Sequence, residues 1–190
     1  MRKRLLILLS IPFGIVGPVH AEYIGVFKDT SGCPCQLYDT TPGLMRVTVL
    51  HVNSPGATWS RFGAPVSSCM YGMTWLSDAA VFPGTVGNSQ EGVSIDYGRC
   101  LTGTFQILAI DYFVQGFTEE CCFYHVLPAA GAASGEIEVG NCKDDVVFVG
   151  GLFDIINSSP SCWCPPPPDA CYPVAVESST WGKIKILYQQ

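Results

Sequence analysis

The cysteines constrain the fold of this chain more than any other residue type. There are ten of them in the sequence: Cys33, Cys35, Cys69, Cys100, Cys121, Cys122, Cys142, Cys162, Cys164 and Cys171. In an exported protein an even number of cysteines predicts a disulfide framework, whose connectivity stays open because ten cysteines allow roughly 945 pairings. In an extended strand the adjacent Cys121 and Cys122 point to opposite faces, so we expect each to have a distant partner.

The N-terminal segment indicates export. Met1–Arg4 is a short basic cluster, Leu5–Val16 is an apolar run, and Val19–Ala21 presents small or aliphatic residues at the two positions that a signal peptidase reads. This order predicts a signal peptide over residues 1–21, cleaved after Ala21. A retained membrane anchor needs about 20 apolar residues, more than the run offers. We expect no transmembrane segment after cleavage and a secreted, periplasmic or cell-surface location.

Two Cys-x-Cys pairs lie near the two ends of the predicted mature domain. Cys33 and Cys35 form one pair, and Cys162 and Cys164 form the other. We expect disulfides to join these ends to each other or to adjoining loops. Such pairs can also hold Cu(I) or Zn(II) as thiolates, but disulfides compete strongly outside the reducing cytoplasm. No metal or other cofactor is therefore predicted.

The charge of the mature chain excludes several classes of partner. Cleavage leaves 190 − 21 = 169 residues, enough for one domain. It removes three basic residues and no acidic one, so the net charge changes from −6 to −6 − 3 = −9. An acidic domain repels phosphate backbones and anionic lipid surfaces. The sequence therefore predicts no nucleic-acid partner.

Period-2 alternation dominates residues 22–164, with Gly, Pro, Asn and Asp between short apolar segments. The predicted strands are Tyr23–Lys28, Leu44–Val52, Val93–Tyr97, Phe105–Val114, Cys122–Leu127, Glu136–Asn141, Val146–Val149 and Leu152–Ile156. Turns are expected at Thr40–Gly43 and Asn53–Gly56. Many short strands favour an all-β antiparallel sandwich, Ig-like or jelly-roll-like, in which disulfides staple loops and sheets around one core.

The C-terminal part has a different composition. Four consecutive prolines open a predicted linker over residues 165–173, and a short tail follows at 174–190. A short helix is expected in the tail, although alternation between Lys183 and Ile186 also permits a strand. The tail is either a recognition or sorting segment or a piece that packs on the domain through Trp181. Its candidate recognition residues are Trp181, Lys183, Lys185 and Tyr188.

Several stretches resemble a family of exported bacterial proteins of uncharacterised function. They are Pro42–Leu44, Val47–Ala57, Gly87–Val93, Cys121–Cys122, Ser134–Val139 and Thr180–Tyr188. Many members of that family end in a similar Thr-Trp-Gly-x-Ile/Val-Lys tail. The resemblance implies a bacterial, exported, β-rich protein and brings no activity with it.

Two histidines of the mature chain, His51 and His125, lie in predicted apolar strands. With Asp96 or Asp111 and a serine, either one is a candidate base of a hydrolytic site, but no nucleophile-elbow or zinc-protease motif accompanies them. Hydrogen-bonded strand histidines are the simpler interpretation. Acidic residues in turns match no calcium-loop spacing.

The functional hypotheses follow from these features. The leading one is a non-catalytic exported module for structure, adhesion or assembly at the cell surface, with a protein or glycan partner. The first alternative is a carbohydrate-binding module in which Trp59 and Trp75 stack on sugar rings. A secreted hydrolase ranks below both.

Overall fold

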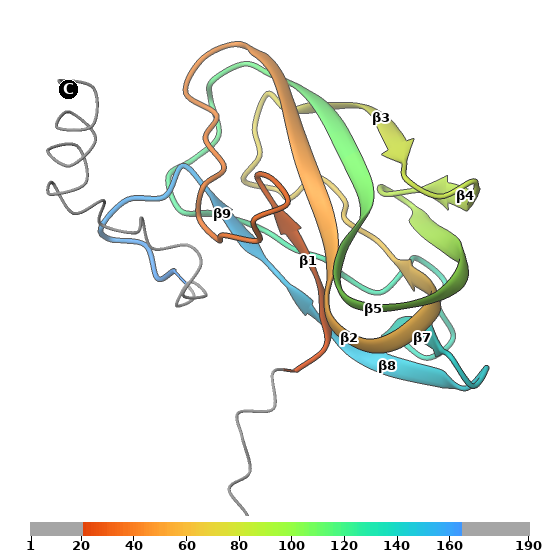
Figure 1. Cartoon of the computed structure of the whole chain (residues 1–190). Coiled ribbons are helices and arrows are strands. Elements are labelled where there is room, and N and C mark those ends of the chain that lie inside the picture. Colours follow the sequence, from red (N-terminus) through yellow and green to blue (C-terminus); the bar gives the residue numbers. More distant parts are fainter. Residues whose placement is uncertain (1–20, 165–190) are drawn as a thin grey trace, which may run out of the picture.

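The computed structural model describes residues 21–164, and its regular elements there are nine β-strands (Figure 1). The strands are β1 (Tyr23–Phe27), β2 (Gly43–Phe62), β3 (Thr74–Ala80), β4 (Gly84–Asn88), β5 (Gly92–Val114), β6 (Cys122–Tyr124), β7 (Ile137–Asn141), β8 (Val146–Leu152) and β9 (Asp154–Ile156). No helix in this range is long and apolar enough to cross a membrane. All of the predicted signal peptide except Ala21, the whole linker and the whole tail lie outside the described residues.

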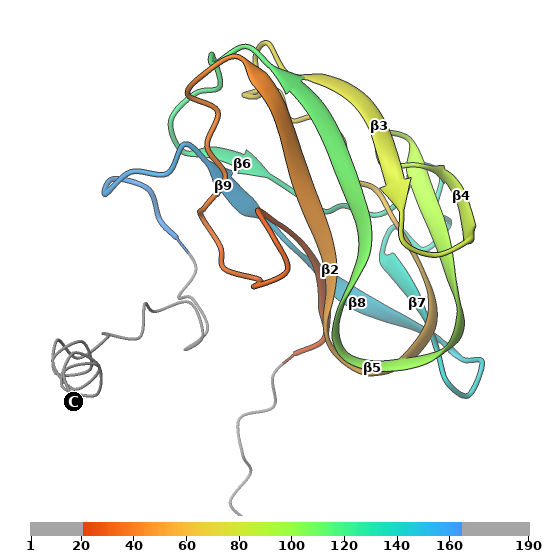
Figure 2. The same cartoon turned by 45° about the horizontal axis from the view of Figure 1, so that its top comes forward.

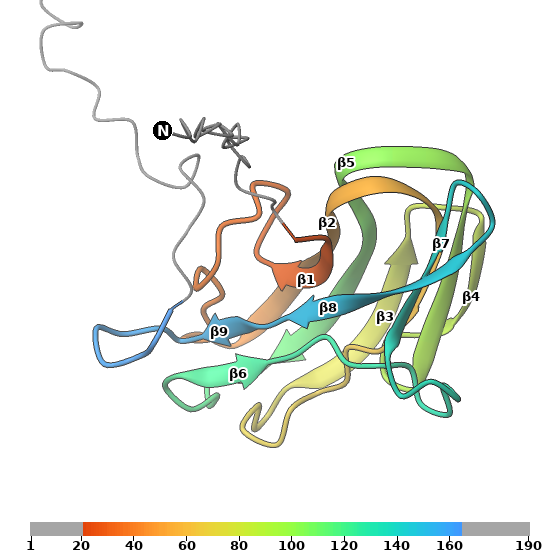
Figure 3. The same ribbon diagram turned by 90° about the horizontal axis from the view of Figure 1, so that it is seen from below.

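Two long, bent strands organise the fold. β2 and β5 pair antiparallel along their whole length, from Gly43 opposite Val114 to Phe62 opposite Val93. Their register shifts several times between residues 49 and 59 of β2, and such bulges bend a strand pair. Figure 3 shows both strands curving over the core. The bend lets this one strand pair contribute to both layers of the sandwich.

The two halves of the β2–β5 pair have different neighbours. The first half of β2 pairs with β1 and the partnering half of β5 pairs with β3, whereas the other halves pair with β7 and β4. β8 joins the layers, because it pairs antiparallel with β7 and then parallel with β1. The predicted all-β sandwich is thus confirmed. The parallel pair β1–β8 is its one departure from antiparallel pairing among the described strands.

The predicted turn at Asn53–Gly56 is instead a corner inside β2. Asn53 and Gly56 have φ angles of 54° and 149°, the positive values that a bulge needs. Residues that favour turns are also those that permit bulges, which is why the sequence pattern indicated the wrong one of the two. A Cβ on Gly56 would lie 2.8 Å from the Cys142 sulfur, so the close approach also requires glycine.

The core lies between the layers and is mainly aliphatic. Inward-facing side chains of β1, β2 and β5, such as Ile24, Val47 and Ile110, are fully buried. Two tyrosines are buried with them, and their hydroxyls satisfy each other: the Tyr112 and Tyr124 oxygens lie 2.6 Å apart, and Tyr124 donates to the Ala64 carbonyl at 3.0 Å. Burial raises the pKa of Tyr112 to about 12, so both stay neutral.

Disulfides connect the elements, and all nine cysteines within residues 21–164 are disulfide-bonded. Four bonds have both partners in that range: Cys35–Cys164, Cys69–Cys122, Cys100–Cys142 and Cys121–Cys162. Cys121 and Cys122 each have a distant partner, as their adjacency predicts. Cys35–Cys164 joins the two ends of the domain across 129 residues. Cys171 lies outside the described residues.

Candidate functional site

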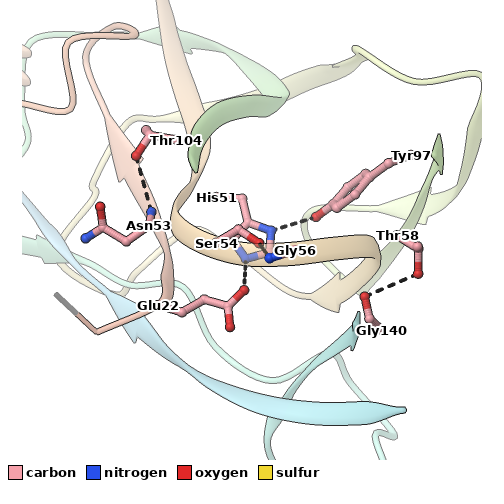
Figure 4. A network of polar contacts seen from close by, with 9 residues as sticks. All are labelled: Glu22, His51, Asn53, Ser54, Gly56, Thr58, Tyr97, Thr104 and Gly140. Atoms are coloured by element: carbon pink, nitrogen blue, oxygen red, sulfur yellow. Dashed lines mark hydrogen bonds and ion pairs between the residues drawn. The ribbon is translucent and has the colours of Figure 1, made fainter. Parts of the chain in front are cut away.

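A buried polar network surrounds His51, beside the corner of β2 (Figure 4). Its Nε2 atom lies 2.8 Å from a carboxylate oxygen of Glu22, and its Nδ1 atom lies 3.1 Å from the Tyr97 hydroxyl. In the neutral ring Nε2–H donates to Glu22 and Nδ1 accepts from Tyr97. The Phe105 ring packs on the imidazole with centroids 5.2 Å apart. Residues of β2 and β5 and the residue directly before β1 therefore meet at the His51 side chain.

The electrostatics of His51 favour the neutral ring. Burial lowers its pKa below the usual 6.5, and the hydrogen bond to Glu22 opposes that shift without overcoming it. The side chain is 0 % exposed, so no solvent-borne substrate can reach either ring nitrogen. The imidazole and Glu22 have the pairing of a catalytic dyad, but in this sealed position they hold the start of β1 against the corner.

The rest of this network fixes the corner itself (Figure 4). The Asn53 amide donates to the Thr104 hydroxyl at 3.2 Å, and the Gly56 amide donates to the Ser54 hydroxyl at 3.2 Å. The disulfide Cys100–Cys142 lies against Gly56. These contacts are architectural, because they satisfy backbone amides that the bulge leaves without a ladder partner.

A second group of side chains lies on the surface over β6 and β9. We call Phe123, His125, Phe153 and Trp163 the aromatic platform. Ring centroids are 5.0 Å apart for Phe123 and Phe153, 5.5 Å for His125 and Phe153, and 5.9 Å for Phe153 and Trp163. Figure 2 shows β6 and β9 side by side at the far side of the molecule from β4. The four rings form one continuous aromatic surface.

Strand alternation places these rings outside. Along β6 and the residues after it, Cys122 and Tyr124 are buried, whereas Phe123, His125 and Leu127 are exposed. An outward strand face is ordinarily polar, so aromatic and apolar residues there need a separate reason. The sequence contains this signal within Cys122–Leu127, but the period alone does not tell which parity faces the core. Phe123 was therefore missed as a candidate. Phe153 and Trp163, which lie outside this segment, were missed as well.

Disulfides support the platform from below. Cys121, which directly precedes β6, is bonded to Cys162, and Cys164 is bonded to Cys35. Trp163 lies between Cys162 and Cys164, and each of these is bonded to a different partner. Its backbone is therefore held on both sides. A cluster of Glu120 with Cys121 and Cys162 has the spacing of a metal site, but both sulfurs are used in the disulfide. Cys121 and Cys162 therefore serve as a covalent link between the two segments that contain them.

A buried loop network adds to this support. The Asp39 carboxylate accepts from the Gly116 amide at 2.8 Å and from the Thr118 hydroxyl at 2.5 Å. Asn157 accepts from the Asp39 amide at 2.7 Å and donates to the Thr118 carbonyl at 2.8 Å. The segments before β2, after β5 and after β9 are thereby tied together beside the platform. Asp39 therefore anchors these segments to one another.

Asp154, the first residue of β9, is a buried carboxylate beneath these loops. One oxygen accepts hydrogen bonds from the Cys35 amide and, at 2.8 Å, from the Ile155 amide. The other oxygen is buried without a hydrogen-bond partner in the described residues. Burial raises the pKa of Asp154 to about 7, and the two backbone amides counter only part of this shift.

The structure separates the two tryptophans proposed for glycan stacking. Trp59 in β2 is half-buried and packs on Gly140, where an added Cβ would lie 1.9 Å from the indole nitrogen. Trp75 in β3 is half-buried and donates its indole N–H to Asp78 at 3.0 Å. Their strand partners on β5 are residues 96 and 112, far apart along that strand. Trp59 and Trp75 therefore do not share one stacking surface.

A surface groove lies beside β4 and the start of β5. It has a volume of about 350 Å³ and is lined mainly by the β4–β5 turn and the chain at residues 129–130. Arg61 at its wall lies 3.7 Å from Glu138, and Glu91 contributes a carboxylate. Neither His51 nor His125 lines it. The groove thus lacks the candidate bases named above.

Comparisons with known proteins give similarity at the level of structure only. No protein-family model matches the sequence, and no curated protein matches it. Solved structures do match. The seventh type I cohesin of ScaB from Pseudobacteroides cellulosolvens is 11 % identical with a TM-score of 0.48, over 73 % of this chain and 94 % of that one.

Two further cohesins give similar values. The sixth cohesin of scaffoldin B from Acetivibrio cellulolyticus, solved in complex with a Cel5 dockerin mutant, is 11 % identical with a TM-score of 0.47, over 74 % of this chain and 100 % of that one. A non-cellulosomal cohesin from the archaeon Archaeoglobus fulgidus is 13 % identical with a TM-score of 0.44, over 72 % and 91 %. We draw no functional conclusion from likenesses of this size.

Proposed function

We propose that this chain is an exported, non-catalytic binding module that acts in structure, adhesion or assembly at the cell surface, with the aromatic platform as its recognition surface. The observation that carries the proposal is the exposure of the platform. Trp163 is 65 % exposed and Phe123 is 38 % exposed, although both belong to one ring cluster. Contiguous exposed aromatic surface favours a binding site over a merely solvated face.

The support under the platform fits this role. A recognition surface binds more tightly when its backbone is already fixed before binding, since less freedom is lost. The disulfides at Cys121 and Cys164 and the hydrogen bonds of Asp39 provide that fixation. The same disulfides require an oxidising compartment, which agrees with the export signal expected at residues 1–21.

The placement of the histidines also favours binding over hydrolysis. His51 is sealed in the core and bonded at both ring nitrogens. His125 stacks on Phe123 with centroids 5.9 Å apart and planes at 18°, so it acts as one more ring of the platform. Among the described residues, the positions of these two histidines give no support to the second candidate function, a secreted hydrolase.

Retention at the cell surface tests the proposal. In the cells that export the full chain, the mature protein is measured in the envelope fraction and in the medium. We expect wild type in the envelope fraction and the double variant Phe123→Ser, Trp163→Ser in the medium. The matched control is Val86→Ser, Val146→Ser, which removes apolar side chains that are 73 % and 54 % exposed on β4 and β8. Equal retention of all three proteins refutes the proposal.

A further inference from the structure

Beside the aromatic platform lies a group of exposed or partly buried polar side chains, close to the disulfide Cys121–Cys162. We call Glu120, Ser158, Ser159 and Ser161 the hydroxyl rim. The Ser159 and Ser161 hydroxyl oxygens lie 2.6 Å apart, and Ser161 donates to a Glu120 carboxylate oxygen at 3.3 Å. Ser158 lies 3.1 Å from the Tyr38 hydroxyl. Short side chains thus present several donors and acceptors in one place.

The rim and the platform are held next to each other by covalent bonds. Glu120 and Ser161 are neighbours in sequence of Cys121 and Cys162, which form a disulfide. Trp163 follows Cys162 directly, so hydroxyls and the most exposed ring of the platform lie on one short segment. A ligand that touches Trp163 is therefore within reach of the rim.

The two surfaces together match the chemistry of a sugar. A pyranose ring has an apolar face of C–H groups, which an aromatic ring can cover, and an edge of hydroxyl groups. Hydroxyl and carboxylate side chains accept and donate hydrogen bonds with such hydroxyls. Aromatic side chains that combine apolar area with low flexibility are effective contact surfaces. A few polar groups beside apolar area also fix the orientation of a ligand.

Charge restricts the class of sugar. Residues 22–164 contain five basic and fourteen acidic residues, 5 − 14 = −9. Two of the five bases are already paired: Arg46 lies 2.7 Å from Asp111, and Arg61 lies 3.7 Å from Glu138. The platform and the rim contain no lysine or arginine. Phosphorylated, sulfated or uronic-acid-rich glycans would meet net repulsion, so the site favours a neutral polysaccharide.

We infer that the aromatic platform and the hydroxyl rim form one binding site for a neutral polysaccharide, with Trp163 as the main stacking ring. The inference rests on the proposed function, because it names the ligand class of the same recognition surface. This site is different from a sugar-stacking site at Trp59 and Trp75. Those two side chains are half-buried, and they lie opposite distant positions of β5.

Affinity electrophoresis of the full mature protein tests the inference. The gels contain neutral polysaccharides (mixed-linkage β-glucan, galactomannan, xyloglucan) or anionic ones (polygalacturonate, dextran sulfate). We expect retardation by at least one neutral polysaccharide and by no anionic one. Trp163→Ala should weaken binding roughly tenfold, the equivalent of about 1.4 kcal/mol. Trp163→Phe should retain part of the affinity, and Ser161→Ala should lower it several-fold.

The matched control is Trp75→Ala, which removes a tryptophan away from the platform and should leave retardation unchanged. Because Trp163 is mostly exposed, its loss should leave the thermal midpoint near that of wild type, and this is measured for each variant. Retardation by anionic polysaccharides alone, or loss of retardation in Trp75→Ala but not in Trp163→Ala, overturns the inference.

Envelope retention and polysaccharide retardation together separate the glycan ligand from the binding function itself. If no neutral polysaccharide retards the protein, while envelope retention still depends on Phe123 and Trp163, the glycan inference is wrong and the binding function stands. Protease treatment of the envelopes then identifies a protein partner by loss of retention. If retention is also independent of both residues, the proposed function is wrong as well.

Discussion

His51 makes part of the stability of this fold depend on pH at the scale of a single residue. Both of its ring nitrogens are used in hydrogen bonds, and its pKa in the folded protein lies below the 6.5 of an unfolded chain. The folded state thus prefers the neutral ring. Its contribution is complete above pH 6.5 and is lost as the pH falls through 6.5 towards the lower folded pKa.

Replacement of His51 by Gln should remove this dependence. A Gln amide can donate to Glu22 and accept from Tyr97 without titrating. Below pH 6.5 the unfolding free energy of wild type should fall more steeply than that of His51→Gln, by up to about 1.4 kcal/mol per pH unit. Urea unfolding with intact disulfides between pH 5 and 8 measures this. Parallel curves for the two proteins would show that His51 does not carry the effect.

At the scale of the elements, Asp154 links β9 to the loop that contains Cys35. Its folded pKa of about 7 lies above the unfolded value of 3.8, which reverses the sign found for His51. Between these two values the unfolded chain loses the proton and the folded one keeps it. The stabilisation is therefore complete below pH 3.8 and is lost as the pH rises towards 7.

The variant Asp154→Asn should gain stability relative to wild type as the pH rises. Asn keeps an oxygen to accept from the Cys35 and Ile155 amides and carries no charge. The difference in unfolding free energy, variant minus wild type, should increase between pH 4 and 7 by on the order of 2–4 kcal/mol. Thermal or urea unfolding across that range provides the measurement. A difference that stays constant with pH contradicts the assignment.

Alternation in the sequence identified the strands that have one buried face. Val93–Tyr97 and Phe105–Val114 were predicted separately and are both parts of β5, joined through exposed residues with little apolar pattern. β3 and β4 were missed. Thr74–Ala80 contains only partly buried or exposed residues, and Gly84–Asn88 contains two glycines in five residues. Edge strands like these depend on pairing with β5 and leave no period in the sequence.

The same limit applies to the candidate site. The cysteines predicted the framework and the stapled ends, but the pairing of Cys100 with Cys142 depends on how β5 and the residue after β7 come together at the β2 corner, beside Gly56. Phe123 and His125 share a parity that the sequence shows. That this parity faces outward follows only from the packing of Tyr124 against Tyr112.

At the scale of the whole molecule, the chain combines a rigid sandwich with one exposed aromatic surface. The bent β2–β5 strand pair and the four described disulfides fix the frame. The platform lies over β6 and β9, away from the β4 side (Figure 2). In the proposed function the frame holds the platform in one conformation, and the platform makes the contacts.

Equilibrium binding of the purified mature protein to isolated envelopes tests this claim most directly. Saturable binding is measured by co-sedimentation for wild type, for Phe123→Ser, Trp163→Ser and for Val86→Ser, Val146→Ser, after far-UV circular dichroism has shown that all three are folded. We expect the platform variant to bind at least about tenfold more weakly, a loss of about 1.4 kcal/mol, and the control to match wild type. Equal affinities for wild type and the platform variant would contradict this claim.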